Sequence, residues 1–341
     1  MQFGLVQNCL GALALFVLFA SCAPAAPQAG GGIGGTGHIA AVASGPITGF
    51  GSVFVSGDEY DTSGTTMTVD GKPGSQGDLN KGMIVRINAT LTGHYDTDKV
   101  VQRTANILLY EDTVEGVVQS VATDGTSLVV LGQTIKISDT TIIDGSVAGH
   151  SLLTLVPDRD VVEVSGFVIG DGLILGTFVG LKTLDIKTQT PDYEVKGFIK
   201  NHKVDQKTFE IGALTIDYQH AILNDMPEEE SDNLWDGLLV DVRGDQVSPG
   251  SSGSLGLRMV ATRIWPEGLG TQESEEAEVE GIVTQVSGTG DFSIGNVRVQ
   301  TNSATLFEGG AVNDIVIGTH LHAKGPLIGG ILTASKVEVE R

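Results

Sequence analysis

Cysteine and basic side chains are both scarce in this chain. Its 341 residues include two cysteines, Cys9 and Cys22, both in the apolar N-terminal stretch, so the rest of the chain has no disulfide framework. Lys and Arg total 20 against 42 Asp and Glu, and no charged side chain precedes Asp58. Because a formal net charge of −22 opposes phosphate approach, we expect no nucleic-acid partner.

Proline and aromatic residues are also few, whereas glycine is abundant. The chain has 10 Pro and 47 Gly, and 40% of its residues are hydrophobic. That apolar content is enough to build cores, and the glycine content is too high for a mainly helical protein. The length predicts several small folded units.

The first 21 residues have the pattern of an export signal. Residues 10–20 form an apolar run that is too short to span a bilayer. The following junction resembles the lipobox of bacterial lipoproteins, in which small residues precede a lipidated cysteine, here Cys22. Phe19 stands where that motif has Leu, and residues 1–8 lack Lys and Arg. An ordinary secretory signal and an uncleaved anchor are the alternatives.

Residues 22–45 are predicted to form a Gly- and Ala-rich tether. Within the tether, Gly32 to Gly37 match the G-x-G-x-x-G pattern, but no strand precedes them and no helix follows, so we expect no dinucleotide site. Ala23 follows the cysteine, which by resemblance to enterobacterial sorting indicates the outer membrane. A membrane partner is therefore expected only through the N-terminal lipid.

Four related units follow the tether, at residues 46–110, 111–188, 189–267 and 277–341, with an acidic linker at 268–276. A glycine between apolar residues recurs in Ile47-Thr48-Gly49-Phe50, Val114-Glu115-Gly116-Val117, Val195-Lys196-Gly197-Phe198 and Val279-Glu280-Gly281-Ile282. Hairpin turns are predicted at Val69-Asp70-Gly71, Val130-Leu131-Gly132, Glu210-Ile211-Gly212 and Ser293-Ile294-Gly295.

Five short strands with a glycine in the first are typical of a small closed barrel. We expect an all-β fold, a tandem array of four OB-like barrels, with SH3-like barrels and immunoglobulin-like sandwiches as alternatives. An OB-fold carries a helix between its third and fourth strands, and Met226-Pro227-Glu228-Glu229-Glu230 predicts one in the third unit.

With these residues in view, the chain resembles the bacterial domain of unknown function family 5666. The best matching stretches are GGIGGTG at 31–37, GPITGFGSVFVSG at 45–57 and YDTSGTTMTVDG at 60–71. The resemblance implies a secreted or lipid-anchored tandem β-protein of undetermined activity. It implies no catalytic residues.

Several candidate sites are weak in the sequence. The tract Gly250-Ser251-Ser252-Gly253-Ser254 lacks the spacing of a nucleophile elbow, and we predict no enzyme, cofactor or metal site. His320 and His322 share one strand face, as metal ligands could require. The repeat alignment, however, matches them to polar residues that face outward. These are Asp241 and Arg243 in the third unit and Arg86 and Asn88 in the first.

Acidic and aromatic residues have simple structural explanations. The stretches Glu228-Glu229-Glu230-Ser231-Asp232 and Glu273-Ser274-Glu275-Glu276, and the group Asp58, Glu59 and Asp61, lack the spacing of a calcium loop. Trp235 is predicted to enter a core strand and Trp265 to end one, both packing in a core.

Together these features predict a lipid-anchored protein of the bacterial cell envelope, with an envelope protein or a glycan as the candidate partner. Its barrels would act as a noncatalytic scaffold or as binding modules. A Ca²⁺- or glycan-binding surface module is the alternative, and a hydrolase with a carboxylate pair is a third. A secreted or periplasmic location is the alternative to the outer membrane.

Overall fold

The computed structural model describes residues 39–92, 101–182, 192–249, 256–270 and 272–340. Strands dominate these residues because β-branched runs alternate between buried and exposed positions. In β6 (Ile84–Thr92), every second side chain is buried, and the same alternation continues along β25 (His320–Ile328). All described residues belong to one unit, Gly37–Arg341.

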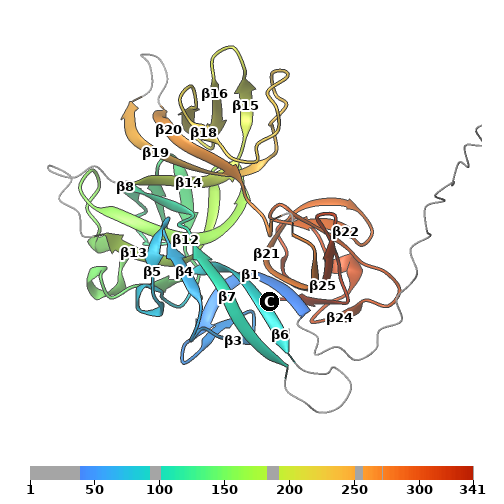
Figure 1. Cartoon of the computed structure of the whole chain (residues 1–341). Helices are drawn as coiled ribbons and strands as arrows, with labels where there is room; N and C mark the ends of the chain where they lie inside the picture. Colours follow the sequence, from blue (N-terminus) through green and yellow to red (C-terminus); the bar gives the residue numbers. More distant parts are fainter. Residues whose placement is uncertain (1–38, 93–100, 183–191, 250–255, 271, 341) are drawn as a thin grey trace, which may run out of the picture. The chain divides into compact units, whose positions relative to one another are not determined.

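The strands fall into four segments, 39–110, 114–182, 193–266 and 274–339, called segments 1 to 4 below (Figure 1). Segment 1 contains β1 (Ile39–Gly49), β2 (Val53–Val55), β3 (Asp58–Asp61), β4 (Thr66–Val69), β5 (Lys72–Gly74), η1 (Gln76–Asp78), β6 and β7 (Gln102–Tyr110). Segment 2 contains β8 (Val114–Val121), β9 (Ser127–Val130), β10 (Gln133–Lys136), β11 (Ile142–Ile143), η2 (Ala148–His150), η3 (Leu152–Thr154), β12 (Val161–Gly170) and β13 (Leu173–Lys182).

Segment 3 contains β14 (Tyr193–Phe198), β15 (Lys200–Lys203), β16 (Thr208–Ile211), β17 (Leu214–Asp217), β18 (Ile222–Leu223), β19 (Leu239–Pro249) and β20 (Leu257–Pro266). Segment 4 contains β21 (Ser274–Gly288), β22 (Asp291–Ile294), β23 (Val297–Gln300), β24 (Leu306–Glu308), η4 (Val312–Asp314), β25, β26 (Ile331–Thr333) and β27 (Lys336–Val339).

Segment 1 closes into a five-stranded barrel. The strand β1 pairs with β2, β2 with β3, β3 with β7, β7 with β6, and β6 with β1. The β3–β7 pair is parallel and the other four pairs are antiparallel. Closure leaves none of these five strands as a free edge of the barrel.

The other segments repeat this order of pairing. In segment 2 the circuit is β8, β9, β10, β13 and β12, again with one parallel pair, β10–β13. In segment 3, β14 and β15 share the role of the first strand, followed by β16, β17, β20 and β19. In segment 4 the last strand is divided into β26 and β27, both paired with β25.

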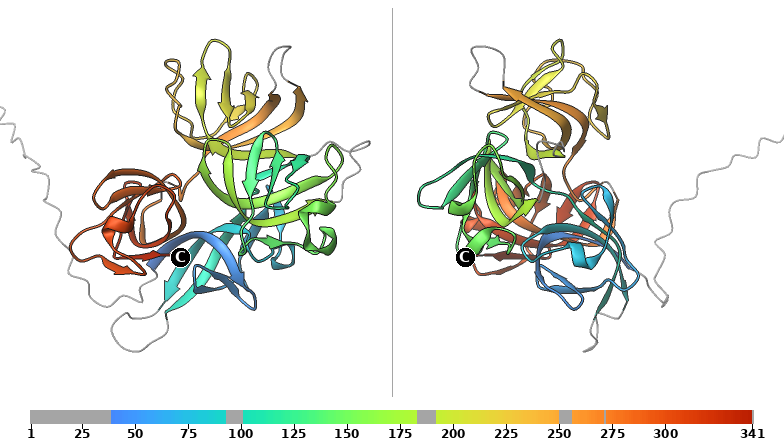
Figure 2. Two further views of the ribbon diagram at one scale, coloured as in Figure 1. Left: turned by 180° about the vertical axis from the view of Figure 1, so that it is seen from behind. Right: turned by 90° about the vertical axis from the view of Figure 1, so that its left-hand side faces the viewer.

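Two further pairings join the segments. In one sheet, β1 runs parallel to β21, from Ala41 opposite Glu276 to Ser44 opposite Val279. In the other sheet, β14 pairs with β8 through Glu194 and Val195. Segments 1 and 4 have separate hydrophobic cores, whereas the cores of segments 2 and 3 are continuous. The strands of segment 4, coloured orange to red, curl round on themselves in every view (Figures 1 and 2).

The predicted helix at 226–230 is wrong. Residues 226–230 have no regular secondary structure, residues 231–237 form a bend and turns, and helical structure in the described ranges is limited to four short 3-10 turns. The acidic run and Pro227 favour a helix start, but a stable helix also needs an amphipathic face of several turns. The residues after Glu230 form turns that place Trp235 in the core.

The repeat register predicted for the first unit is also wrong. Val69-Asp70-Gly71 belongs to an additional β4–β5 hairpin, and the turn that corresponds to Leu131-Gly132 is Ser56-Gly57. Strand pairing likewise makes Gly45 rather than Gly49 the equivalent of Gly116. All four predicted hairpins are confirmed as hairpins, and only the first lies at a position that is not equivalent to the others.

The recurring glycine has a common packing role. A Cβ atom at Gly45, Gly116, Gly197 or Gly281 would come within 2.2–2.8 Å of a side chain in the hairpin between the second and third strands. The equivalence of Gly116, Gly197 and Gly281 predicted from the sequence is therefore confirmed. A missing side chain at this point lets the hairpin close over the first strand.

Some sequence-derived features lie outside the described residues. These are the export signal with Cys9, the lipidation candidate Cys22, most of the tether with its G-x-G-x-x-G match, and the serine-rich tract at 250–254. Within the described ranges, no helix is long and apolar enough to cross a membrane.

Candidate functional site

A polar face on segment 3 forms one wall of the candidate site. Cross-strand pairing sets Lys196 of β14 opposite Asp241 of β19, and Asp241 opposite Trp265 of β20. Since side chains two residues apart share a strand face, the neighbouring row, which runs from Glu194 through Arg243 to Arg263, lies on the same side. This polar face continues into a groove.

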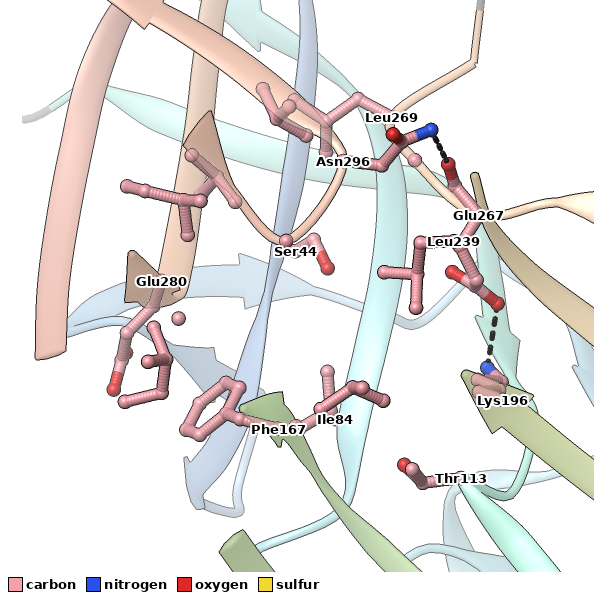
Figure 3. Close-up of a pocket in the computed structure, with 18 of the residues that line it drawn as sticks. Ser44, Ile84, Thr113, Phe167, Lys196, Leu239, Glu267, Leu269, Glu280 and Asn296 are labelled. Carbon is pink, nitrogen blue, oxygen red and sulfur yellow. Dashed lines mark hydrogen bonds and ion pairs between the residues drawn. The ribbon is translucent and has the colours of Figure 1, made fainter. Parts of the chain in front are cut away.

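The groove lies where segments 1, 3 and 4 meet and has a volume of about 710 Å³. It adjoins a smaller cavity of about 120 Å³, which is also lined by residues of segment 2 (Figure 3). Both spaces are lined by Ser44, Ile84, Glu111, Lys196, Glu267, Gly268, Leu269, Asn296 and Val297. We call the two spaces together the junction groove.

The floor of the junction groove holds a charged pair. The Nζ atom of Lys196 lies 2.9 Å from Glu267 and 3.4 Å from Asp241, and the backbone carbonyl of Glu267 accepts a 2.9 Å hydrogen bond from Asn296 (Figure 3). Burial opposes ionisation of Glu267, but the charge and hydrogen bond of Lys196, together with Arg86 and Asp241, outweigh burial and lower the pKa of this carboxyl. Burial raises the pKa of Asp241 to about 7, despite the opposing charge of Lys196.

Arginines and one tryptophan line the outer part of the junction groove. Arg243 pairs with Glu111 and, at 3.1 Å, with Glu194, and its guanidinium lies 5.6 Å from the ring centroid of Trp265. Arg263 is exposed directly across the β19–β20 pair from Arg243. Such a wall combines guanidinium donors with an aromatic surface.

A second cluster lies between segments 1 and 2. Lys182 places its Nζ atom 2.8 Å from Glu163, 3.0 Å from Asp70, 3.3 Å from Glu115 and 3.7 Å from Asp112. Burial, followed by the charge of Asp70, raises the pKa of Asp112 well above its usual value. Four carboxylates thus share one ammonium group in a largely buried position.

A third cluster joins segments 1 and 4. Lys324 and Arg103 both pair with Asp58 and Glu276, at distances of 2.8–3.3 Å, and Lys324 also pairs with Glu278. Burial and a hydrogen bond with Asp58 raise the pKa of Glu278 to about 8.

Three groups of carboxylates in the described ranges are close enough to share a metal ion, namely Asp58-Glu276-Glu278, Asp70-Asp112-Glu115 and Asp70-Glu111-Glu194. Each group, however, already contacts a Lys or Arg side chain. That built-in cation takes the place of a metal charge, so we assign these groups to holding the segments together.

The strand histidines face away from the core of their segment as predicted, since His320 and His322 alternate with the buried Leu321 and Ala323 along β25. His322 corresponds to Asp241, and His320 to Leu239, a shift of two residues from the sequence alignment. Asp241 is fully buried, and the side chain of His322 is 12% exposed. These polar faces meet neighbouring segments instead of solvent. The side chain of His320 lies 3.2 Å from Glu280.

The two tryptophans differ in environment. Trp235 packs in the core as predicted, fully buried and stacked on His202 at 4.3 Å, but it lies in a turn before β19. Trp265 is half-buried in the groove wall, so core packing is wrong for it.

The acidic stretches are divided by the fold. Glu229 pairs with Lys207 and Asp232 with Lys203, whereas Glu276 enters the third cluster. The sequence predicted neither the charged pair of Lys196 nor the clusters around Lys182 and Lys324. For two of them, the available signal was a charged residue directly before the recurring glycine, Glu115 and Lys196.

The fold and the site define an all-β protein whose tandem segments are joined by strand pairing and buried ion pairs. Residues 115–179 and 280–338 match the family model described as Domain of unknown function (DUF5666). These regions lie in segments 2 and 4, and their match confirms the family resemblance. The matched residues differ from the stretches at 31–71 that suggested it. No curated protein matches the chain.

Proposed function

We propose that this chain is a noncatalytic, lipid-anchored binding module of the bacterial cell envelope, with its ligand site in the junction groove. The groove itself carries the proposal. It is lined by residues of segments 1, 3 and 4 and combines guanidinium groups, amides and a half-buried indole. A concave site with a few convergent polar groups is the usual form of a ligand site.

We also propose that the four segments are OB-like barrels. Each follows the same order of strand pairing, with one parallel pair between the third and last strands. In each segment the recurring glycine of the first strand also packs against the hairpin between the second and third strands. This order is the Greek-key order of a five-stranded OB barrel.

A noncatalytic role fits the state of two carboxylates that line the groove, Glu111 and Glu267. Glu111 is paired with Arg243, and Glu267 with Lys196. A general base must be free to accept a proton within reach of substrate, and a carboxylate held by a cation is a weaker base.

The remaining parts of the proposal concern location and partners. Lipidation of Cys22, with the tether at 22–45, would hold the barrels at a membrane, at the outer membrane by the resemblance in sorting. A secreted or periplasmic form without lipid is the alternative location. An envelope glycan or protein is the expected partner, because the net charge of −22 opposes nucleic acid.

A glycan array probed with the protein tests the binding role. We expect the wild type to bind at least one glycan class and Trp265→Ala to lose that binding, since aromatic rings stack on sugar faces. Phe50→Ala, at an exposed aromatic residue outside the groove, is the matched control and should bind normally. Equal binding by all three proteins would place the site elsewhere, and no binding by the wild type would contradict the glycan partner.

A further inference from the structure

We propose that the junction groove takes a glycan with an isolated uronic acid residue, whose carboxylate pairs with Arg263 and whose ring packs on Trp265. This inference rests on the proposed function and names its ligand class. Its warrant is the charge of the groove lining, the unpaired guanidinium of Arg263, and the position of the indole.

The larger space of the junction groove has a formal charge opposite to that of the whole chain. Its lining contains four cationic side chains, Arg86, Lys196, Arg243 and Arg263, and three carboxylates, Glu111, Asp225 and Glu267, a formal balance of +1, whereas the smaller cavity adds Glu280. The whole chain carries −22. The larger space is therefore a local exception, where a single negative charge meets attraction.

Three of the four cations are already engaged. Lys196 pairs with Glu267, Arg243 pairs with Glu111, and Arg86 donates a 3.0 Å hydrogen bond to the carbonyl of Gly268. The side chain of Arg263, by contrast, makes no hydrogen bond or ion pair within the part of the chain that the structure describes. Its planar guanidinium suits a bidentate pair with one carboxylate.

Trp265 is the second recognition element. It lies two residues after Arg263 on β20, so both side chains lie on the same strand face. Arg243 stacks over the indole at 5.6 Å, and the ring lines the groove. The apolar face of a pyranose ring can pack on such an indole while its carboxylate reaches the neighbouring guanidinium.

A dense polyanion fits this site less well than an isolated acidic sugar. Single-stranded nucleic acid carries a phosphate at every nucleotide and needs several free cations along its path. The groove offers one free guanidinium, and the rest of the chain is strongly acidic. A ligand with one carboxylate therefore matches the one unpaired guanidinium that the groove offers.

Calorimetric titration with paired ligands tests the proposal. The ligands are oligosaccharides with one glucuronate, galacturonate or mannuronate residue, their carboxyl-reduced counterparts, and an oligothymidylate of similar length. We expect at least one uronate to bind about tenfold or more tightly than its reduced counterpart, the strength of one charge-assisted pair. Arg263→Gln should abolish this preference, and Trp265→Ala should weaken both members of the pair.

Arg159→Gln, at an exposed arginine outside the groove, is the control and should leave binding unchanged. Equal binding of acidic and reduced sugars would overturn the ligand class while leaving the proposed groove intact. A preference that survives in Arg263→Gln would overturn the role of that residue. Tighter binding of oligothymidylate than of any uronate would also overturn the proposal. Failure of every glycan here and on the array would instead count against the proposed function.

Discussion

At the scale of single residues, buried carboxyl groups outnumber the cations that hold them. Asp241 and Glu278 are almost fully buried, and burial is the main reason that their pKa values rise to about 7 and about 8. In each case a second carboxyl group lies within hydrogen-bonding range, Glu194 beside Asp241 and Asp58 beside Glu278. A proton shared within each pair relieves the repulsion between two buried negative charges.

This arrangement predicts that stability falls as the pH rises. In the folded chain Glu278 keeps its proton to about pH 8, whereas its ordinary pKa is 4.5. The folded state therefore binds more protons between these values, and the stability present at low pH is lost as the pH rises through the folded pKa. We expect the Tm to drop by roughly 5 °C or more between pH 5.5 and pH 8.5, as measured by calorimetry.

Glu278→Gln should reduce this drop, because the amide stays neutral at every pH. Asp61→Asn, at an exposed carboxylate bonded to Ser63, is the control and should leave the pH profile unchanged. A Glu278→Gln profile parallel to that of the wild type would contradict the assignment.

The recurring glycine makes a second prediction at this scale. A Cβ atom at Gly281 would lie 2.8 Å from Ile294, whereas Gly288 of the same strand has open space around it. Gly281→Val should therefore destabilise the chain by roughly 1–3 kcal/mol through overpacking. Urea unfolding of both variants measures the difference, and equal loss of stability in Gly281→Val and Gly288→Val would argue against the packing role.

At the scale of elements, neighbouring segments meet through strands with polar faces. The parallel pairing of β1 with β21 brings Glu276 and Glu278 towards Asp58 of β3, and Lys324 and Arg103 neutralise the group. If Lys324 or Arg103 is removed, the three carboxylates keep only one cationic partner. The loss of folding free energy should then exceed the stability that the intact cluster contributes, because buried negative charges remain unpaired.

Lys324→Met should accordingly destabilise the chain by about 2–4 kcal/mol at pH 8, below the upper range for buried pairs because Lys324 keeps partial solvent access. Lys72→Met removes an exposed pair with Asp192 and should cost less than about 0.5 kcal/mol. Chemical unfolding compares the two variants. The assignment would fail if both lost the same stability, or if adding Glu278→Gln to Lys324→Met recovered none of the loss.

Local sequence patterns predicted most elements, but they matched some residues of one segment to the wrong residues of another. Turn residues identified hairpins reliably, since Leu131 and Gly132 both adopt positive φ and close a two-residue turn. The extra β4–β5 hairpin in segment 1 has the same signature at Asp70 and Gly71, and no local signal distinguishes it from a barrel hairpin. The helix predicted at 226–230 failed because tertiary packing overrode a short local preference.

At the scale of the whole molecule, the proposed lipid anchor would determine where the proposed binding module works. If Cys22 carries acyl chains, each buried CH₂ contributes about 0.8 kcal/mol and more than one chain holds the protein at a membrane. We expect the wild type to incorporate labelled fatty acid and partition into detergent, and Cys22→Ser to do neither. Cys9→Ser is the matched control and should behave as the wild type. Unlabelled wild type in the aqueous phase would contradict lipidation and favour an ordinary secretory signal.

The sequence by itself determined the all-β class, the repeated units, most hairpins and the family, because turn residues, alternation and the recurring glycine act over a few positions. Only the tertiary structure decided which polar faces are buried. Alternation places Asp241, Arg243 and His322 on the face away from their own barrel core, and it carries no information on whether solvent or another segment covers that face. Lys196, Glu267 and Trp265 likewise meet in one groove through pairings between distant strands and connections, which no local pattern records.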